Sequence, residues 1–160
     1  MCTSVSLIYI INNNKTIENI KKIINNKKIT LSFFIDSSFL NKNIDIITKL
    51  ENHEIYNYGN NGIYTKDNLI ITNNIINNKS QNNSLYCLFL NKNEESLNNC
   101  KNNKMFSIIP TINGNYNDIK NNIQNGSIIL INNTKELPNI ISFIKNKGYN
   151  IIPLSKLIKE

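Results

Sequence analysis

The sequence predicts an α/β fold with a mostly parallel sheet. Along its 160 residues, short apolar runs of strand length alternate with longer segments in which apolar residues recur every three or four positions. About seven strand-like runs occur, and each is followed by a helix-like segment. Because parallel strands need a long crossover connection, usually a helix, this alternation favours a parallel sheet, closed or nearly closed. No linker or repeat divides the chain, so we expect one domain over residues 1–160.

The first half of the chain contains three expected strands, which are short runs rich in β-branched and aromatic residues. They are Val5–Ile11, Thr30–Ile35 and Glu54–Tyr56. Three helices are expected from the spacing of their apolar residues. They are Thr16–Ile24, Ile44–Leu50, which ends before His53, and Lys66–Asn77.

The second half continues the same alternation. Its expected strands are Leu85–Leu90, Met105–Ile109, Ser127–Ile131 and Asn150–Ile152. Its expected helices are Glu94–Cys100, Asn117–Ile123, Leu137–Asn146 and Leu154–Ile158. Ligands of parallel α/β folds bind at the carboxyl ends of the strands, so the residues just after each strand are the first candidates for a site.

The net charge of +7 comes from lysine alone, because the chain has no arginine. The lysines are scattered singly or in pairs, and without arginine there is no bidentate contact to bases or phosphates. We therefore expect a solvated basic surface and no nucleic-acid partner.

No run approaches the ~20 apolar residues of a transmembrane helix, so no membrane-spanning segment is expected. The first residues lack the charged region and cleavage site of a signal peptide. The compartment stays open: cytoplasmic as written, or the cell envelope if an anchor has been trimmed.

Asparagine and isoleucine are the most frequent residues, and the chain has no alanine. Residues with A/T-rich codons are in excess, so we interpret the asparagine runs as a result of genome base composition and not as a prion-like tract.

The three cysteines, Cys2, Cys87 and Cys100, have no C-x-x-C spacing and do not suggest zinc. We interpret Cys87 as a buried core thiol; a Cys87–Cys100 disulfide is the alternative if the chain is exported.

Two stretches carry a resemblance to a known family. Residues 32–62 begin S-F-F-I-D-S-S-F-L and end H-E-I-Y-N-Y-G-N-N-G, and Gly126–Asn133 reads G-S-I-I-L-I-N-N, followed by Leu137-Pro138. These stretches resemble the polysaccharide deacetylases (NodB-like, carbohydrate esterase family 4). That family has T-F-F-V before a helix, then G-H-E-I-G-N-H-S-x-x-H, and later G-S-I-I-L-L-H-D. The resemblance implies a NodB-like distorted or incomplete (β/α) barrel.

The resemblance also implies where a reaction centre would lie, and every such position differs in this chain. Two carboxylates of the family, a general base and a metal ligand in T-F-D-D-G, correspond to Ile10 and Ile11. Its two histidine metal ligands correspond to Tyr58 and Gly62, and its catalytic histidine corresponds to Asn132. The degenerate metal positions are thus Ile11, Tyr58 and Gly62. The arginine-containing R-P-P-Y-G loop has no counterpart.

Metal-assisted amide hydrolysis needs a metal that polarises the carbonyl, together with a placed base and acid. Isoleucine and glycine supply neither, so we expect no bound metal and no deacetylase activity. Two alternatives stay open. One is a divergent carbohydrate hydrolase that uses Asp36 and His53, although His53 is more simply a structural residue. The other is a protein-interaction module.

Glycan binding could survive the loss of chemistry. Amide, hydroxyl and aromatic groups bind sugars through hydrogen bonds and stacking. Such groups are expected at the strand ends, at Asn12, Asp36, Asn57, Tyr58, Thr111 and Asn132. The candidate partners are therefore a cell-wall glycan or a protein. The competing interpretation is that polar turn residues simply fill the cleft, with Asp36 capping the next helix.

Overall fold

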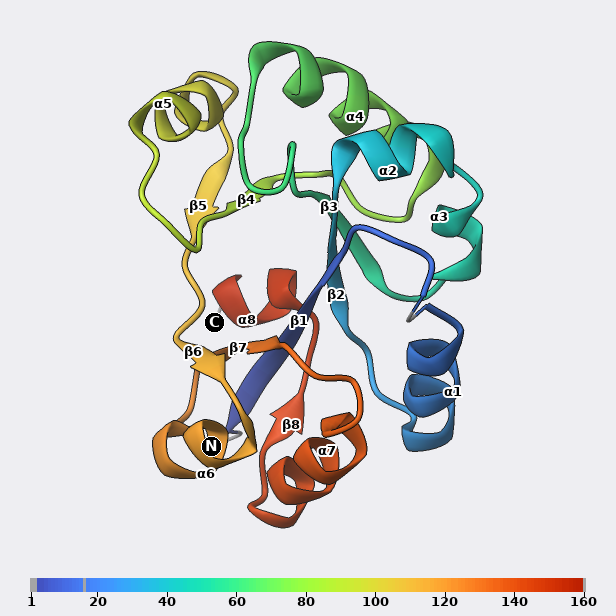
Figure 1. Ribbon diagram of the computed structural model, residues 1–160. Helices are drawn as coiled ribbons and strands as arrows, with labels where there is room; N and C mark the ends of the chain where they lie inside the picture. Colours follow the sequence, from blue (N-terminus) through green and yellow to red (C-terminus); the bar gives the residue numbers. More distant parts are fainter. Residues whose placement is uncertain (1–2, 16, 160) are drawn as a thin grey trace. The chain divides into compact units, whose positions relative to one another are not determined.

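The computed structural model describes residues 3–15 and 17–159 and contains eight strands and eight helices (Figure 1). The expected α/β fold is confirmed, and the ladders whose direction is resolved are parallel. Two sheets are formed and neither closes on itself, which agrees with an incomplete barrel. Thr16 and Cys2, which entered the sequence predictions, lie outside the described residues. The chain divides into two compact units.

The first unit contains residues 3–9, 14–32 and 110–159, apart from residue 16. It contains four of the six strands of the larger sheet: β1 (Ser4–Ile11), β6 (Ile112–Gly114), β7 (Ile128–Ile131) and β8 (Asn150–Ile151). β1 pairs with β7 through Ser6 and Ile128 and with β8 through Ser4 and Asn150. β6 extends the sheet beyond β7.

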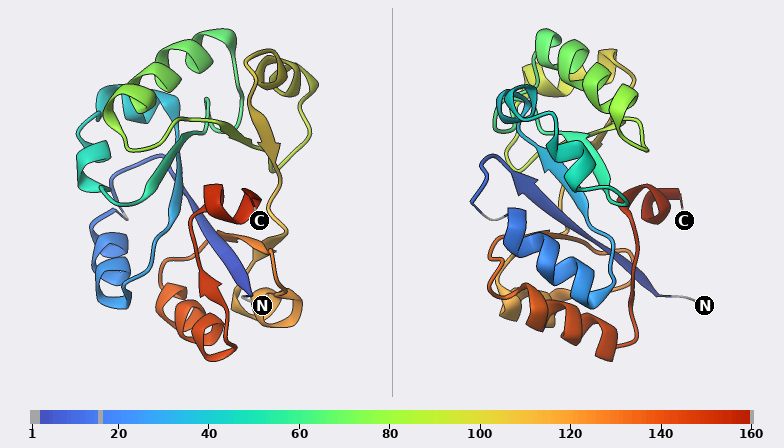
Figure 2. Two further views of the ribbon diagram at one scale, coloured as in Figure 1. Left: turned by 180° about the vertical axis from the view of Figure 1, so that it is seen from behind. Right: turned by 90° about the vertical axis from the view of Figure 1, so that its right-hand side faces the viewer.

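Four helices belong to this unit: α1 (Ile17–Lys27), α6 (Tyr116–Asn122), α7 (Leu137–Asn146) and α8 (Leu154–Lys159). α7 buries the face formed by Leu137, Ile140, Ile141 and Ile144, as the spacing predicts. α1 lies beside α7 (Figure 2), and α6 contacts α7 from another side. These apolar faces cover the sheet and form the core of the unit.

The second unit contains residues 10–13 and 33–109. Its strands are β2 (Ser32–Ile35), β3 (Glu54–Asn57), β4 (Tyr86–Leu88) and β5 (Phe106–Ile108). Its helices are α2 (Ser37–Lys42), α3 (Ile46–Lys49), α4 (Lys66–Lys79) and α5 (Glu94–Asn102). β2 neighbours β3, while β4 and β5 form a separate parallel pair.

Side chains bridge the interval between β3 and the segment that leads into β4. The Asn82 amide bonds both backbone groups of Ile55, at 2.9 Å to its N–H and 2.7 Å to its carbonyl. The Ser84 hydroxyl accepts from the N–H of Asn57 at 3.0 Å. The Tyr64 hydroxyl donates to the Asn57 carbonyl and accepts from the N–H of Leu88. These bonds satisfy strand-edge groups that would otherwise be buried without partners.

Two elements differ from the sequence prediction. β6 was not predicted, because three residues that end in glycine carry too little apolar pattern. The helix expected around Ile44–Leu50 is instead the four-residue α3, preceded by the unexpected α2. A polar capping residue, Asp36, starts α2, and only two large apolar residues follow it.

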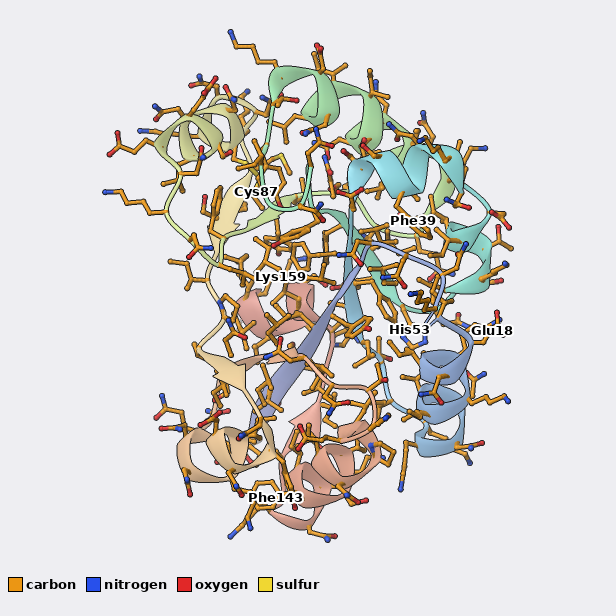
Figure 3. All side chains as sticks on the ribbon, in the orientation of Figure 1. Glu18, Phe39, His53, Cys87, Phe143 and Lys159 are labelled. Atoms are coloured by element: carbon orange, nitrogen blue, oxygen red, sulfur yellow. A yellow bond between two sulfur atoms is a disulfide. The ribbon has the colours of Figure 1, made fainter. Side chains whose placement is uncertain are left out.

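A disulfide joins Cys87 on β4 to Cys100 on α5, with 6.6 Å between their Cα atoms (Figure 3). The core-thiol interpretation of Cys87 is therefore wrong, and the alternative applies. Both cysteines are fully buried among Tyr64, Leu69 and Met105. The apolar run around Cys87 could not distinguish the two cases, because a buried free cysteine and a buried disulfide have the same apolar neighbourhood.

Among the described helices, none has both the length and the apolar character needed to cross a membrane.

Candidate functional site

The loop after β3 carries the positions that the resemblance assigns to metal ligands. It folds back on itself, since the N–H of Gly62 donates to the carbonyl of Tyr58 at 2.9 Å and that of Asn60 donates to Ile63 at 2.8 Å. Gly59 and Gly62 have φ angles of +62° and +93°, in the left-handed region that favours glycine. The loop therefore depends on glycine at both positions.

The phenol of Tyr58 lies against the α-carbon of Gly62. A Cβ placed on Gly62 would be 3.2 Å from the Tyr58 hydroxyl oxygen and 3.4 Å from the ring carbon that bears it. Tyr58 is only 7% exposed. The ring of Tyr58 thus takes up the space into which a side chain at position 62 would project.

The pKa of the Tyr58 hydroxyl lies above its usual value of 10.0, first because burial disfavours the phenolate and second because of the negative charge of Asp36. The hydroxyl therefore stays protonated at neutral pH. A neutral phenol donates a hydrogen bond well and is a poor ligand for a divalent metal.

Asp36 directly follows β2 and is 8% exposed. One carboxylate oxygen accepts from the N–H of Phe39 at 3.0 Å and caps α2, and the other accepts from the N–H of Asn61 at 2.9 Å. Asp36 thereby ties the loop after β3 to the start of α2. Both carboxylate oxygens serve the scaffold, as the capping interpretation predicts.

Asn57 is fully buried, and its side chain also serves the scaffold. Its amide nitrogen donates to the Asn68 carbonyl at 3.0 Å and to the Asn73 side chain at 3.1 Å. Its amide oxygen accepts from the N–H of Gly59 at 2.7 Å. These three bonds fix the backbone that leads into Tyr58.

A cavity of about 150 Å³ opens beside Tyr58 within the second unit. Its lining comes from the loop after β3 and from the segment that follows β4: Tyr58, Asn61, Gly62, Ile63, Leu90, Asn91, Lys92 and Asn93. The Asn93 side chain accepts from Ser96 and caps α5, which leaves its two amide hydrogens as donors. The lining therefore combines one tyrosine, several asparagines and one lysine. The volume of the cavity suits a single substituent of a ligand, since whole drug-sized ligands need about 300 Å³ or more.

The segment 90–93 was not among the residues predicted to form a site. It follows β4, so the rule that ligands bind after strand ends could have identified it. The family's R-P-P-Y-G motif gives no signal at this segment, because none of those letters occurs in it. Asn91 and Lys92 are exposed at the rim.

His53 and Asp36 are separated by the length of β3. His53 precedes Glu54, the first residue of β3, whereas Asp36 bonds Asn61, beyond the other end of that strand. His53 instead packs edge-to-face on Phe33, with 5.6 Å between ring centroids, and lines a different cavity of about 160 Å³ (Figure 3). A hydrolase that uses these two residues together has no support from this geometry.

Thr111 and Asn132, in the first unit, lie at opposite ends of two paired strands. Thr111 precedes β6, and its hydroxyl accepts from the N–H of Ile128 at 2.8 Å and donates to the Ile128 carbonyl at 3.1 Å. Asn132 follows β7 and donates to the Asn113 side chain at 2.9 Å. Thr111 follows β5, as predicted, and it also precedes β6, which was not predicted.

The donor set does not fit the divalent metal that the resemblance implies. Ile10 and Ile11, where the family has two carboxylates, are aliphatic, and Ile11 is buried. Asn12, which follows them, is exposed. Within residues 3–15 and 17–159, no three histidine, cysteine, aspartate or glutamate side chains gather. The family's divalent metal needs about three such protein ligands at catalytic sites, and these positions supply none.

Comparison of the sequence with protein-family models and with curated proteins finds no match. Comparison of the fold with solved structures does find matches. One is peptidoglycan deacetylase PdaC from Bacillus subtilis (TM-score 0.78, 16% identity, 99% of this chain and 91% of that one). Another is a wild-type CE4 family pseudoenzyme from Bacillus anthracis (TM-score 0.83, 18% identity, 98% of this chain and 66% of that one).

A third match is the CE4 domain of a multidomain xylanase from the hindgut metagenome of Trinervitermes trinervoides (TM-score 0.77, 17% identity, 99% of this chain and 91% of that one). Almost the whole chain aligns in each case. The chain therefore has the NodB-like fold of the family 4 carbohydrate esterases, and the resemblance read from its sequence is confirmed for the fold.

Proposed function

We propose that this chain, a domain with the fold of the family 4 carbohydrate esterases, is a pseudoenzyme that performs no metal-dependent deacetylation and retains glycan binding. The observation that carries the proposal is the pairing of Tyr58 with Gly62. One position has a neutral, buried phenol, the other has no side chain, and the phenol fills the space between them.

The same pairing supports binding. The Tyr58 hydroxyl is a neutral donor at pH 7, and Tyr58 borders a cavity that Asn61, Asn91 and Asn93 also line. Hydroxyl and amide groups can bond the acetamido or hydroxymethyl substituent of a sugar. We therefore propose an N-acetylglucosamine polymer of a cell wall as the ligand, with one substituent in the cavity.

The catalytic part of the proposal is tested by metal content and acetate release. The purified protein is incubated with Zn²⁺, Co²⁺ or Ni²⁺, dialysed and analysed by elemental mass spectrometry, and then mixed with an N-acetylglucosamine oligomer. We expect less than stoichiometric metal and no acetate above background. Stoichiometric metal together with acetate release would overturn the pseudoenzyme proposal.

The binding part is tested by titrating ¹⁵N-labelled protein with the same oligomer. We expect amide shifts in the segments 58–63 and 90–93. Tyr58→Phe, which removes the hydroxyl and keeps the ring, and Asn91→Ala, at the exposed rim, should each weaken binding by about three- to tenfold, the worth of one hydrogen bond. Gln81→Ala is the matched control, because Gln81 lines the other cavity of the same unit. Equal binding by all three variants would contradict the assigned site.

A protein-interaction module is a second candidate, and one observation favours it. Phe106 on β5 and the nearby Ile109 are 63% and 71% exposed, an unusual amount for large apolar side chains. Size-exclusion chromatography with light scattering tests this candidate. A monomer at all concentrations that retains glycan binding would favour the first proposal.

A further inference from the structure

A groove lies between α6 and α7, within residues 110–159. Its volume is about 350 Å³, which falls in the range of ligand sites. Six residues line it: Tyr116, Asn139, Ser142, Phe143, Asn146 and Lys147. None of these residues takes part in the cavity beside Tyr58, which belongs to the other unit.

Two aromatic rings form the apolar part of the groove. Tyr116 on α6 and Phe143 on α7 meet edge-to-face, with 5.8 Å between centroids and an interplanar angle of 79°. Both side chains are only half-buried. The protein has no tryptophan, so stacking on a sugar falls to tyrosine and phenylalanine.

Two lysines lie over these rings. The ammonium of Lys120 is 5.4 Å from the centroid of Tyr116, and that of Lys147 is 5.8 Å from the centroid of Phe143. No carboxylate lines the groove. The nearest acidic residue on α6, Asp118, is engaged in the capping box with Asn115. The groove therefore has one lysine in its lining, Lys147, and a second lysine, Lys120, over the Tyr116 ring that borders it.

The polar part of the groove comes from one face of α7. Asn139, Ser142 and Asn146 follow the i, i+3, i+7 spacing of a helix face. The amides of Asn139 and Asn146 are exposed to solvent. The Ser142 hydroxyl accepts from Lys27 at 3.4 Å. Amides in this arrangement provide both donors and acceptors for hydroxyl groups.

We propose that this groove binds a sugar residue that carries a carboxylate or a phosphate. The sugar's apolar face would stack on the rings, its hydroxyls would bond the α7 amides, and its anionic group would contact Lys120 and Lys147. A neutral sugar would lack the last contact. The groove is thus a second binding site with a preference for anionic sugars, distinct from the cavity beside Tyr58.

The test compares two ligands that differ only at C6, which is a carboxylate in one and a neutral hydroxymethyl group in the other. Methyl β-D-glucuronide and methyl β-D-glucoside are each titrated into ¹⁵N-labelled protein, and shifts of the Asn139 and Asn146 side-chain amides are followed. We expect the glucuronide to bind more tightly by about tenfold, since two exposed ion contacts differ between the complexes. Methyl glucoside 6-phosphate, in a third titration, shows which anionic group is preferred. Equal affinity for the charged and neutral sugars, or no shift with any of them, would overturn the proposal.

Variants then assign the effect to the groove. Lys120→Gln/Lys147→Gln should remove the preference for the charged sugar, and Phe143→Leu should weaken both sugars while preserving apolar volume. Lys22→Gln/Lys156→Gln removes the same charge from exposed positions of the same unit and should change neither affinity. Tyr58→Phe should also leave groove binding unchanged, so the failure of one site is distinguished from that of the other. A control variant that weakens glucuronide binding as much as the groove variant would show non-specific attraction and contradict the proposal.

Discussion

Tyr58 and Gly62 are complementary in shape at the residue scale. The phenol fills space that is open only because position 62 lacks a Cβ, and the positive φ at Gly62 makes any side chain there costly. A Gly62→His exchange would thus meet the Tyr58 phenol. Restoring a metal ligand at position 62 requires the ring at position 58 to be removed as well.

The first prediction measures this coupling. Gly62→Ala should lower the free energy of unfolding by about 1–2 kcal/mol through its left-handed backbone alone. Contact with the Tyr58 hydroxyl should add on the order of 0.5 kcal/mol, and Tyr58→Phe should remove that addition. Urea denaturation of the four proteins in this double-mutant cycle gives the coupling energy. Zero coupling would mean that the phenol does not take up the space.

A second prediction concerns Tyr64, whose hydroxyl connects β3 to β4. Tyr64→Phe leaves the N–H of Leu88 and the carbonyl of Asn57 without their buried partner and should lower the free energy of unfolding by about 1–3 kcal/mol at pH 8. Tyr116→Phe, on the half-buried ring of α6, is a control that should change stability little. The urea midpoints of both variants and the parent check this.

The same residue gives the protein a pH dependence. Burial raises the pKa of Tyr64 above its usual value of 10.0. Above pH 10 the unfolded state has therefore released a proton that the folded state retains. The stabilisation is fully present below pH 10 and is lost as pH rises towards the folded pKa. We expect the urea midpoint to fall between pH 8 and pH 11, and to fall less in Tyr64→Phe. An equal fall in both proteins would contradict this assignment.

At the scale of elements, the β3–β4 interval depends on side chains where a regular sheet would use backbone ladders. Asn82, Ser84 and Tyr64 take over those bonds. Alternation alone could predict both strands, because it reports burial. Alternation could not predict that side chains replace the backbone ladder between β3 and β4. An asparagine whose amide bonds a strand edge looks the same in the sequence as an asparagine in a turn.

The candidate site likewise has features that the local sequence predicts and features that it does not. The loop glycines and the cap at Asp36 follow from local chemistry, and the capping role of Asp36 was predicted. The inward amide of Asn57 and the contribution of segment 90–93 depend on contacts between residues distant in sequence, which a pattern along the chain does not contain. β6 escaped prediction for the same reason, since a three-residue strand is recognised only by its partner β7.

A third prediction concerns the disulfide between β4 and α5. It closes a loop whose ends are 13 residues apart, and this loop carries Leu90–Asn93, one wall of the cavity. Closing a loop of that size contributes about 3 kcal/mol by restricting the unfolded chain. Cys87→Ser/Cys100→Ser should therefore lower the urea midpoint and weaken oligomer binding. Thiol titration of the denatured, unreduced protein checks the bond itself, and Cys2→Ser is the control. Three free thiols would contradict it.

At the scale of the whole molecule, a net charge of +7 attracts every anion, so charge alone does not identify a ligand. A comparison of the two proposed sites can distinguish this general attraction from specific recognition of a ligand. In the cavity beside Tyr58 the one lysine of the lining, Lys92, is paired with Glu94 at 3.6 Å, whereas the α6–α7 groove relies on Lys120 and Lys147. Ionic strength should affect them differently, because salt shortens the screening length from about 10 Å at 0.1 M to about 3 Å at 1 M.

The fourth prediction follows from that difference. Raising NaCl from about 0.05 M to about 0.5 M shortens the screening length roughly threefold. This change should leave the affinity for the neutral N-acetylglucosamine oligomer unchanged. The affinity for methyl β-D-glucuronide should fall towards that for the neutral glucoside, because the ammonium groups of Lys120 and Lys147 are screened while stacking on Tyr116 and Phe143 persists. Isothermal titration at both salt concentrations measures both ligands on one preparation. Oligomer binding that weakened as steeply as glucuronide binding would mean that general charge attraction, and not the Tyr58 cavity, holds the neutral glycan.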